Sequence, residues 1–242
     1  MRSLATRLAT SLARPPVDLR DHVPDVRQQG ARPLCVPFAA TTAHEALRSL
    51  VRATAEVEAL AVEPVWQHCV DHGRGDHNGT TIADASNAMD ERGQPSEATW
   101  PYDGTLGADT EPDPPATANV DWHCANVLDV PIAHDGVEDL IELALAAEFV
   151  VVLLIELTHE FENPDLDGEI AVPIITSALG DYHGVVVVGA ATSADGLTRR
   201  LLVRNSWGPG WGAGGYGWIP IDYLTAFAVQ AAVLDPRTML TY

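Results

Sequence analysis

The stretch RQQGARPLCVPFAA, residues 27–40, decides the fold, because it opens a helix at a cysteine. A helical run rich in Ala and Leu is predicted from Phe38 to Arg52. Pro37 is compatible with this helix only in the first turn, where no internal N–H donor is needed. A helix N-terminus lowers the pKa of a thiol, and the thiolate is the reactive form. Cys35 is therefore a candidate nucleophile, although an isolated cysteine in such a helix is more often a small core residue.

A thiol nucleophile needs an imidazole from elsewhere in the chain, held in place by a third polar group. The segment DYHGVVVVGA (181–190) places His183 immediately before a predicted buried strand. The segment RNSWGPGWG (204–212) places Asn205 at the end of the next strand. If these strands pair, His183 and Asn205 meet while Cys35 faces them across a cleft. Alone, His183 could be a structural histidine, and the second segment could be a glycine-rich hairpin with packed tryptophans.

The rest of the chain predicts a helical first half and a β-rich second half. A helix is expected from Thr81 to Arg92, ending at Gly93. Another is expected after an Asp135 cap, with an apolar stripe at Val137, Leu140, Ile141 and Ala144. Buried strands are predicted at Val150–Leu157, Val185–Val188, Leu201–Arg204 and Ala228–Leu234. The acids between Asp103 and Asp113 are expected to form a solvated loop, and the cleft between the lobes is the expected active site.

Composition limits the function classes. The formal net charge is −20, so the chain would not neutralise phosphates, and no nucleic-acid partner is expected. Three cysteines do not make an even disulfide framework, which favours a reducing compartment. No stretch is long enough to span a membrane. A soluble cytoplasmic protein is therefore expected; secretion is left open, and the sequence does not indicate an oligomeric state.

Three segments of the chain resemble the signature blocks of the papain-like cysteine peptidases. They are PVDLRDHVPDVRQQGARPLCVPFAA (16–40), DYHGVVVVGA (181–190) and LLVRNSWGPGWGAGGYGWIP (201–220). The resemblance covers most of residues 17–224, and it implies thiol-dependent peptide-bond hydrolysis with Cys35 as nucleophile, His183 as base and Asn205 as orienter. Without a long pro-segment, the chain looks most like the short bacterial branch of the family.

The resemblance implies further roles, residue by residue. Gln29, six positions before Cys35 (35 minus 29), matches the family's oxyanion glutamine. Trp207 matches a tryptophan that shields the His–Asn hydrogen bond. Asn78 and Gly79 look like an Asn-Gly segment whose glycine backbone pairs with an extended peptide. The block WPY (100–102) is similar to one that closes the helical lobe.

The chain also departs from the family's pattern around the cysteine. Pro33, Leu34 and Val36 replace the usual Gly-Ser and aromatic neighbours, and Arg32 stands where a half-cystine is usual. Gly184 stands where alanine is more usual after the histidine. Substrate specificity therefore does not carry over from the family.

These observations predict an α+β, papain-like two-lobe fold with a helical N-terminal lobe and a β-barrel-like C-terminal lobe. Residues 1–16 are expected to be an N-terminal extension and residues 17–242 the catalytic domain. Within it, the helical lobe is expected from about residue 29 to 118 and the β-rich lobe from about 119 to 242, with 17–28 crossing to the latter. The expected partner is a peptide or protein substrate.

Alternatives remain open at this point. The same dyad could serve an amide-forming acyltransferase or a thioesterase, a view supported only by the surroundings of Cys35 and by a chain whose 14 basic residues are all arginine. A binding module on an inactive peptidase scaffold is a third possibility, since Val36, Pro37 and Gly184 could misplace the dyad. A zinc site is a competing interpretation of four residues, although the reaction requires no metal or organic cofactor. These four are His68, Cys69, His72 and His77.

Overall fold

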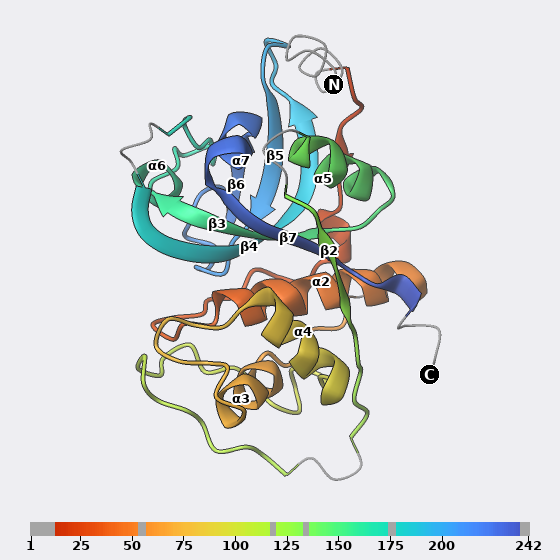
Figure 1. The fold of residues 1–242 in the computed structure, drawn as a ribbon, viewed down its shortest axis with the longest axis vertical. Helices are drawn as coiled ribbons and strands as arrows, with labels where there is room; N and C mark the ends of the chain where they lie inside the picture. The colour runs from red at the N-terminus through yellow and green to blue at the C-terminus, as the bar shows by residue number, and fades with distance from the viewer. Residues whose placement is uncertain (1–12, 53–56, 117–119, 133–135, 174–177, 238–242) are drawn as a thin grey trace.

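Helix α2 (Cys35–Arg52) lies between the other helices of the N-terminal lobe and the β-sheet of the C-terminal lobe (Figure 1). The structure is a computed structural model that describes residues 13–52, 57–116, 120–132, 136–173 and 178–237, with side chains from residue 180 in the last range. Buried residues run without a break from Val36 to Ser49. The helix is therefore covered on all sides, and its polar side chains need partners inside the protein.

In the described part of the N-terminal lobe, one further helix packs on α2 and another packs on that helix. Helix α3 (Glu63–Asp71) contacts α4 (Ile82–Glu91), and α4 contacts α2. The Thr81 hydroxyl caps α4 by accepting a hydrogen bond from the N–H of Asp84, and Gly93 follows the helix with a positive φ of 79°. The predicted helix in this region is confirmed, whereas α3 was not predicted as an element.

The C-terminal lobe is built on one antiparallel sheet. Its strand order, with bounds, is β2 (Val127–Val130), β7 (Ala228–Leu234), β3 (Val151–Thr158), β4 (Ala178–Thr192), β5 (Arg199–Arg204) and β6 (Tyr216–Pro220). Strand β1 (Val17–Asp18) pairs with β4 at Gly189 and Ala190, next to a 3₁₀ turn, η1 (Arg20–His22). Within the described residues the sheet stays open between β2 and β6, so the α+β division is confirmed but the sheet does not close into a barrel.

Three helices accompany the sheet. They are α5 (Val137–Ala146), α6 (His159–Glu162) and α7 (Ile221–Phe227). Val137 and Ile141 of α5 are buried as predicted, but Leu140 is 40% exposed. The predicted Asp135 cap lies outside the described residues, and Gly136 occupies the N-cap with a φ of 102°. None of the described helices combines the length and apolarity that crossing a lipid bilayer requires.

Two arginines tie the segment that crosses between the lobes. Arg204, at the end of β5, donates hydrogen bonds of 2.5 and 2.7 Å to the carbonyls of Pro24 and Asp25. Arg27 points the other way and donates at 2.7 Å to the buried carboxylate of Glu45 on α2. The crossing segment is therefore bonded to both lobes.

Strand β4 is longer than its apolar pattern predicts. It begins at Ala178, so His183 lies inside the strand, opposite Ile155 of β3, and not immediately before a strand. The preceding Tyr182 pairs with Glu156 but is 59% exposed. Exposed residues on an extended segment carry no apolar signal, which is why the pattern revealed only the buried half of the strand.

Candidate active site

Cys35 is the first residue of α2 and lines a pocket of about 400 Å³ between the lobes. Residues of the loop 73–81 form one wall of this pocket, and Leu154, Tyr182 and Gln230 form the other. Cys35 itself is partly exposed. Burial raises the pKa of its thiol, and backbone hydrogen bonds from Gly184 and Val36 oppose that rise.

The strand that carries His183 packs directly on the start of α2. A Cβ atom on Gly184 would lie 3.1 Å from the carbonyl carbon of Cys35 and 3.1 Å from Cα of Val36. Glycine at this position therefore permits a close approach between β4 and the residue that carries the thiol.

His183 and Asn205 are hydrogen-bonded, with 2.7 Å between Nε2 and Oδ1. The main-chain N–H of Ser206 donates to the same Oδ1 at 2.7 Å, which identifies this atom as the amide oxygen, because an N–H cannot donate to an NH₂ group. Nε2 of His183 is then the donor, so Nδ1 is the free acceptor nitrogen of the neutral ring. This is the tautomer that a base needs in order to take a proton from a thiol.

The imidazole is shielded from water. Burial lowers the pKa of His183 to about 4, and the hydrogen bond to Asn205 acts in the opposite direction. A lone positive charge on His183 and a lone negative charge on Cys35 are therefore both disfavoured. Proton transfer from the thiol to the ring creates the two charges together, and their attraction offsets part of the burial penalty.

An aromatic cluster (Phe161, Trp207 and Trp211) provides this shielding. The Trp207 ring centroid lies 4.6 Å from that of His183, and the fully buried Phe161 ring lies 5.9 Å from both. Trp211 packs 5.0 Å from Phe161 and donates its Nε1–H to the Phe161 carbonyl. Sequence reasoning singled out Trp207 but missed Phe161, which lies in an acidic segment without a recognisable motif.

Gln29, which directly follows the segment 17–28, is hydrogen-bonded to Ser206, the residue after Asn205. Its amide Nε2 donates to the Arg32 carbonyl at 3.0 Å, and its Oε1 accepts from the Ser206 hydroxyl at 2.6 Å. Its main-chain N–H also donates to the Ser206 carbonyl at 2.8 Å. Ser206 thus contacts both Gln29 and Asn205. It lies inside the quoted NSWG block, yet no role was assigned to it from sequence.

Asn78 and Gly79 lie in the pocket wall, in the same pocket as Cys35. Gly79, with a φ of 101°, closes a turn in which its N–H and C=O both pair with Asp76, at 2.8 and 3.1 Å. Its backbone is therefore already hydrogen-bonded. Among the described residues, the main-chain N–H and C=O of the next residue, Thr80, have no partner.

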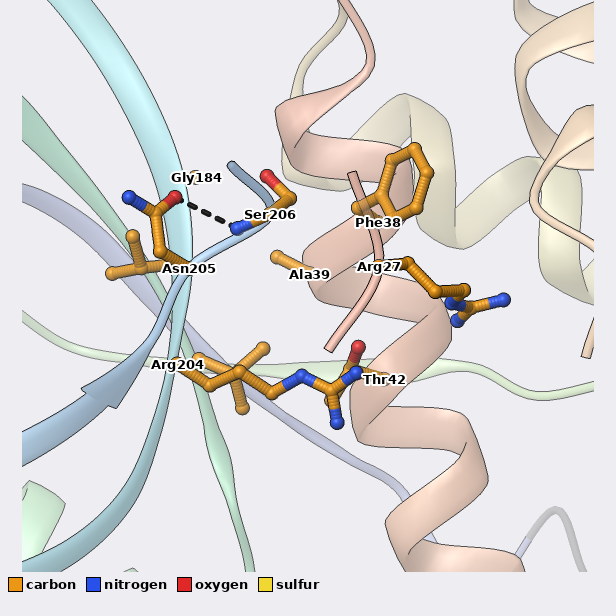
Figure 2. Close-up of a pocket in the computed structure, with 10 residues that line it drawn as sticks. Arg27, Phe38, Ala39, Thr42, Gly184, Arg204, Asn205 and Ser206 are labelled. Carbon is orange, nitrogen blue, oxygen red and sulfur yellow. Dashed lines mark hydrogen bonds between the residues drawn. The ribbon is translucent and has the colours of Figure 1, made fainter. Parts of the chain in front are cut away.

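A small cavity of about 10 Å³ lies between α2 and the neighbouring parts of β4 and β5 (Figure 2). Its walls include Ala39 and Thr42 from α2, and Asn205 from the β-rich lobe. The space is about that of one water molecule. Asn205 Nδ2 is buried and has no hydrogen-bond partner within the described residues; in Figure 2 it points away from Ser206.

The residues considered for zinc are arranged differently. The rings of His68 and His72 stack with centroids 4.1 Å apart, and Nε2 of His68 lies 3.1 Å from a carboxylate oxygen of Glu91. In the part of the chain that the structure describes, no three His, Cys, Asp or Glu side chains group as a metal site. Packing and the contact with Glu91 account for these histidines.

Comparisons with known proteins identify the family of the chain. Residues 14–233 match the papain family of cysteine proteases. The chain is 31% identical over 215 residues to Cysteine protease 1 of Oryza sativa subsp. japonica, covering 83% of this chain and 39% of that protein. It is 31% identical over 225 residues to Cathepsin R of Mus musculus, covering 89% and 63%. The chain thus spans less than two thirds of the length of these relatives.

A solved structure shows the same fold. Xylellain, a cysteine protease from Xylella fastidiosa, superposes with a TM-score of 0.75 at 22% identity, covering 93% of this chain and 88% of that chain. This likeness confirms the predicted papain-like fold, and the family match extends over nearly the whole chain. The chain therefore belongs to the papain family of cysteine proteases.

Proposed function

We propose that the protein hydrolyses peptide bonds through an acyl-enzyme on Cys35. The observation that carries the proposal is the hydrogen bond between His183 of β4 and Asn205, the residue after β5, together with the close packing of β4 on the start of α2, where Cys35 lies. Nδ1 of His183 takes the thiol proton while Sγ of Cys35 attacks the peptide carbonyl. Family membership supports this chemistry, although the relatives are longer than this chain.

The tetrahedral intermediate needs donors for its oxyanion. The main-chain N–H of Cys35 and the second N–H of the Gln29 amide are the proposed donors, since Nε2 uses one of its two protons on the Arg32 carbonyl. Each such donor contributes about 3 kcal/mol in comparable enzymes. His183 then protonates the leaving amine, and a water that it deprotonates releases the acid from Cys35.

The pocket wall supplies a place for the substrate backbone. Because both main-chain groups of Gly79 are bonded to Asp76, we propose that those of Thr80 pair with an extended peptide instead. Asn78 and Gly79 then shape the turn that presents Thr80 to the pocket that Cys35 lines. Trp207 is proposed to act by covering His183 and not by direct contact with substrate.

Peptide release from an unfolded protein tests hydrolysis. The wild type is incubated with a denatured protein in H₂¹⁸O, with and without hydroxylamine, and the products are analysed by mass spectrometry. Hydrolysis places one ¹⁸O in each new carboxyl group, whereas an acyltransferase yields mainly hydroxamates. Cys35→Ala should release nothing, and the matched Cys124→Ala variant, which changes another partly exposed cysteine, should behave as the wild type.

Three outcomes separate the alternatives. Fragments with ¹⁸O that require Cys35 support a peptidase. Products formed only with the acceptor would replace this proposal by acyl transfer. An absence of any product, together with a Cys35 thiol no more reactive than Cys124, would favour the binding module.

A further inference from the structure

Arg32 is a fully buried arginine that lies between Gln29 and Cys35 in the chain and bonds to two glutamates of the helical lobe. Its guanidinium makes two hydrogen bonds with Glu63, at 2.5 and 3.0 Å, and one of 2.5 Å with Glu111. The side chains of Arg32 and Glu63 are 0% and 1% exposed. Burying such charges is unfavourable unless the geometry is well satisfied, and replacement by apolar residues is often neutral for stability. Stability alone therefore does not explain this cluster.

The same residue is bonded to the proposed oxyanion donor. The Arg32 carbonyl accepts the Gln29 amide at 3.0 Å and the N–H of Leu34 at 2.9 Å. The guanidinium also lies over the Tyr102 ring, 5.4 Å from its centroid, and the Tyr102 hydroxyl donates to the Gln29 carbonyl. The main chain of Arg32 thus holds the side chain of Gln29. The side chain of Arg32 covers the Tyr102 ring, whose hydroxyl holds the main chain of Gln29.

The third partner comes from a loop far along the chain. Glu111 lies in the acidic segment expected to be solvated, but its carboxylate accepts from Trp66 Nε1 at 2.8 Å and binds Arg32. Its side chain is 34% exposed. Glu111 thus lies in an exposed loop, as expected, and its carboxylate connects this loop to the residue that holds Gln29.

We propose that Arg32 is a positioning residue: its side chain, fixed by Glu63 and Glu111, sets the carbonyl that aims the Gln29 amide at the oxyanion. The proposal rests on the proposed function, because it takes Gln29 as an oxyanion donor. We therefore expect the Arg32 cluster (Arg32, Glu63 and Glu111) to affect the stability of the tetrahedral adduct but not the reactivity of the Cys35 thiol.

Two reactions of Cys35 distinguish an effect of Arg32 on the Gln29 amide from a general disturbance of the site. A peptide aldehyde forms a thiohemiacetal: an Sγ–C bond forms, the carbonyl π-bond breaks, and its oxygen takes the thiol proton through His183. This adduct places an oxygen in the oxyanion site. Iodoacetamide instead alkylates Sγ by displacing iodide and creates no oxyanion. The ratio of aldehyde affinity to alkylation rate therefore reports on binding of the adduct, its oxygen included, separately from thiol reactivity.

The comparison uses a set of short N-capped peptide aldehydes on the full chain. Arg32→Met should weaken the tightest aldehyde by about 10- to 100-fold while the alkylation rate stays within about twofold, since displacing a positioned group by about 1 Å has effects of this size. Glu111→Gln, a milder change in a partly exposed residue, should weaken it by about three- to tenfold. Adding Arg32→Met to Gln29→Ala should cause no further loss, because both act through one amide.

Arg199→Met is the matched control. Arg199 is also a buried arginine bonded twice to a buried glutamate, Glu142, with side chains 1% and 2% exposed. It begins β5 and pairs with Thr192 of β4, nine residues or roughly 30 Å along the strand from His183. It should leave both readouts unchanged wherever the variant is folded.

The results decide as follows. The proposal is supported if Arg32→Met lowers aldehyde affinity but keeps the alkylation rate, and if adding it to Gln29→Ala lowers the affinity no further. Equal loss of both reactions, full additivity, or wild-type aldehyde affinity in Glu111→Gln and Arg32→Met would overturn it. If Arg32→Met does not fold, Glu111→Gln decides alone. A wild type that binds the aldehyde but releases no fragments would contradict hydrolysis and leave the Arg32 comparison intact.

Discussion

Nε2 of His183 lies 2.7 Å from Oδ1 of Asn205, and the Ser206 N–H fixes the orientation of that amide. The imidazole therefore has one defined tautomer and one defined ring orientation before any substrate binds. Loss of the Asn205 amide should therefore affect the rate of the reaction more than substrate binding.

Asn205→Ala should lower kcat by about 10- to 100-fold with a smaller change in KM, because the ring loses the bond that orients Nδ1. Initial rates on a cleaved peptide measure both constants. Asn163→Ala, which removes an exposed amide bonded to the His159 carbonyl, is the control. Equal kcat in the two variants would contradict an orienting role for Asn205.

Alkylation of Cys35 by iodoacetamide should be nearly independent of pH from about 5 to 8 in the wild type. The acid limb is expected near the pKa of His183, about 4, because protonation of the ring removes the acceptor for the thiol proton. In His183→Ala the rate should instead rise about tenfold per pH unit, as for an isolated thiol with a pKa near or above 8.5. Intact-mass labelling gives both profiles, and identical profiles would refute the dyad.

Trp207→Ala should move that acid limb to higher pH. Burial lowers the pKa of His183, so admitting water where the Trp207 ring lies brings the pKa back towards 6.5. The same labelling profile measures the shift. Trp122→Ala, which removes a tryptophan that stacks with Arg92 at the end of α4, should leave the acid limb in place. An unmoved limb in Trp207→Ala would show that other groups keep water out.

His44 should make the protein sensitive to mild acid. Burial lowers its pKa to about 4, and the hydrogen bond to Gln94 opposes this shift. The unfolded chain, with a pKa near 6.5, therefore binds more protons between these values, and stability falls as pH decreases from 6.5 to 4. The loss approaches about 3 kcal/mol for this group.

Urea unfolding of the wild type and His44→Leu at pH 7 and pH 4 isolates that contribution. The wild type should lose about 3 kcal/mol more than the variant between the two pH values, because carboxyl groups contribute equally to both. An equal loss in the two proteins would mean that His44 is not buried in its neutral form.

Local pattern was enough to predict much of the fold. Helix α4 and strand β7 were predicted to within a residue, because Thr81 is a strong N-cap and the apolar run of β7 ends at Asp235 and Pro236. The start of α2 was predicted from Phe38, although the helix already begins at Cys35, since Pro37 obscures the first turn. Helix α3 was missed because its polar and aromatic residues carry a weak apolar signal.

The site could be predicted only where a residue belongs to a recognisable block. Cys35, His183 and Asn205 were named; His183 and Asn205 are hydrogen-bonded, Gly184 beside His183 packs on the main chain of Cys35, and the roles of all three stay predictions until the variants are made. Ser206 and Glu111 could not be assigned, because their partners are distant in sequence: 177 residues separate Ser206 from Gln29, and 79 separate Glu111 from Arg32. The two main-chain hydrogen bonds between Gly79 and Asp76 close a local turn that no sequence motif predicts.

The crossing of residues 17–28 also has a consequence for synthesis. Val17 pairs with Ala190 of β4, and Arg204 at the end of β5 holds Pro24 and Asp25, so the first strand of the domain can pair only after β4 and β5 have been synthesised. Cys35, the proposed nucleophile, is synthesised 148 residues (183 minus 35) before His183, its proposed base. Under the proposed mechanism, the Cys35 thiol of a nascent chain can become activated only after the β-rich lobe has been synthesised and has packed against the start of α2.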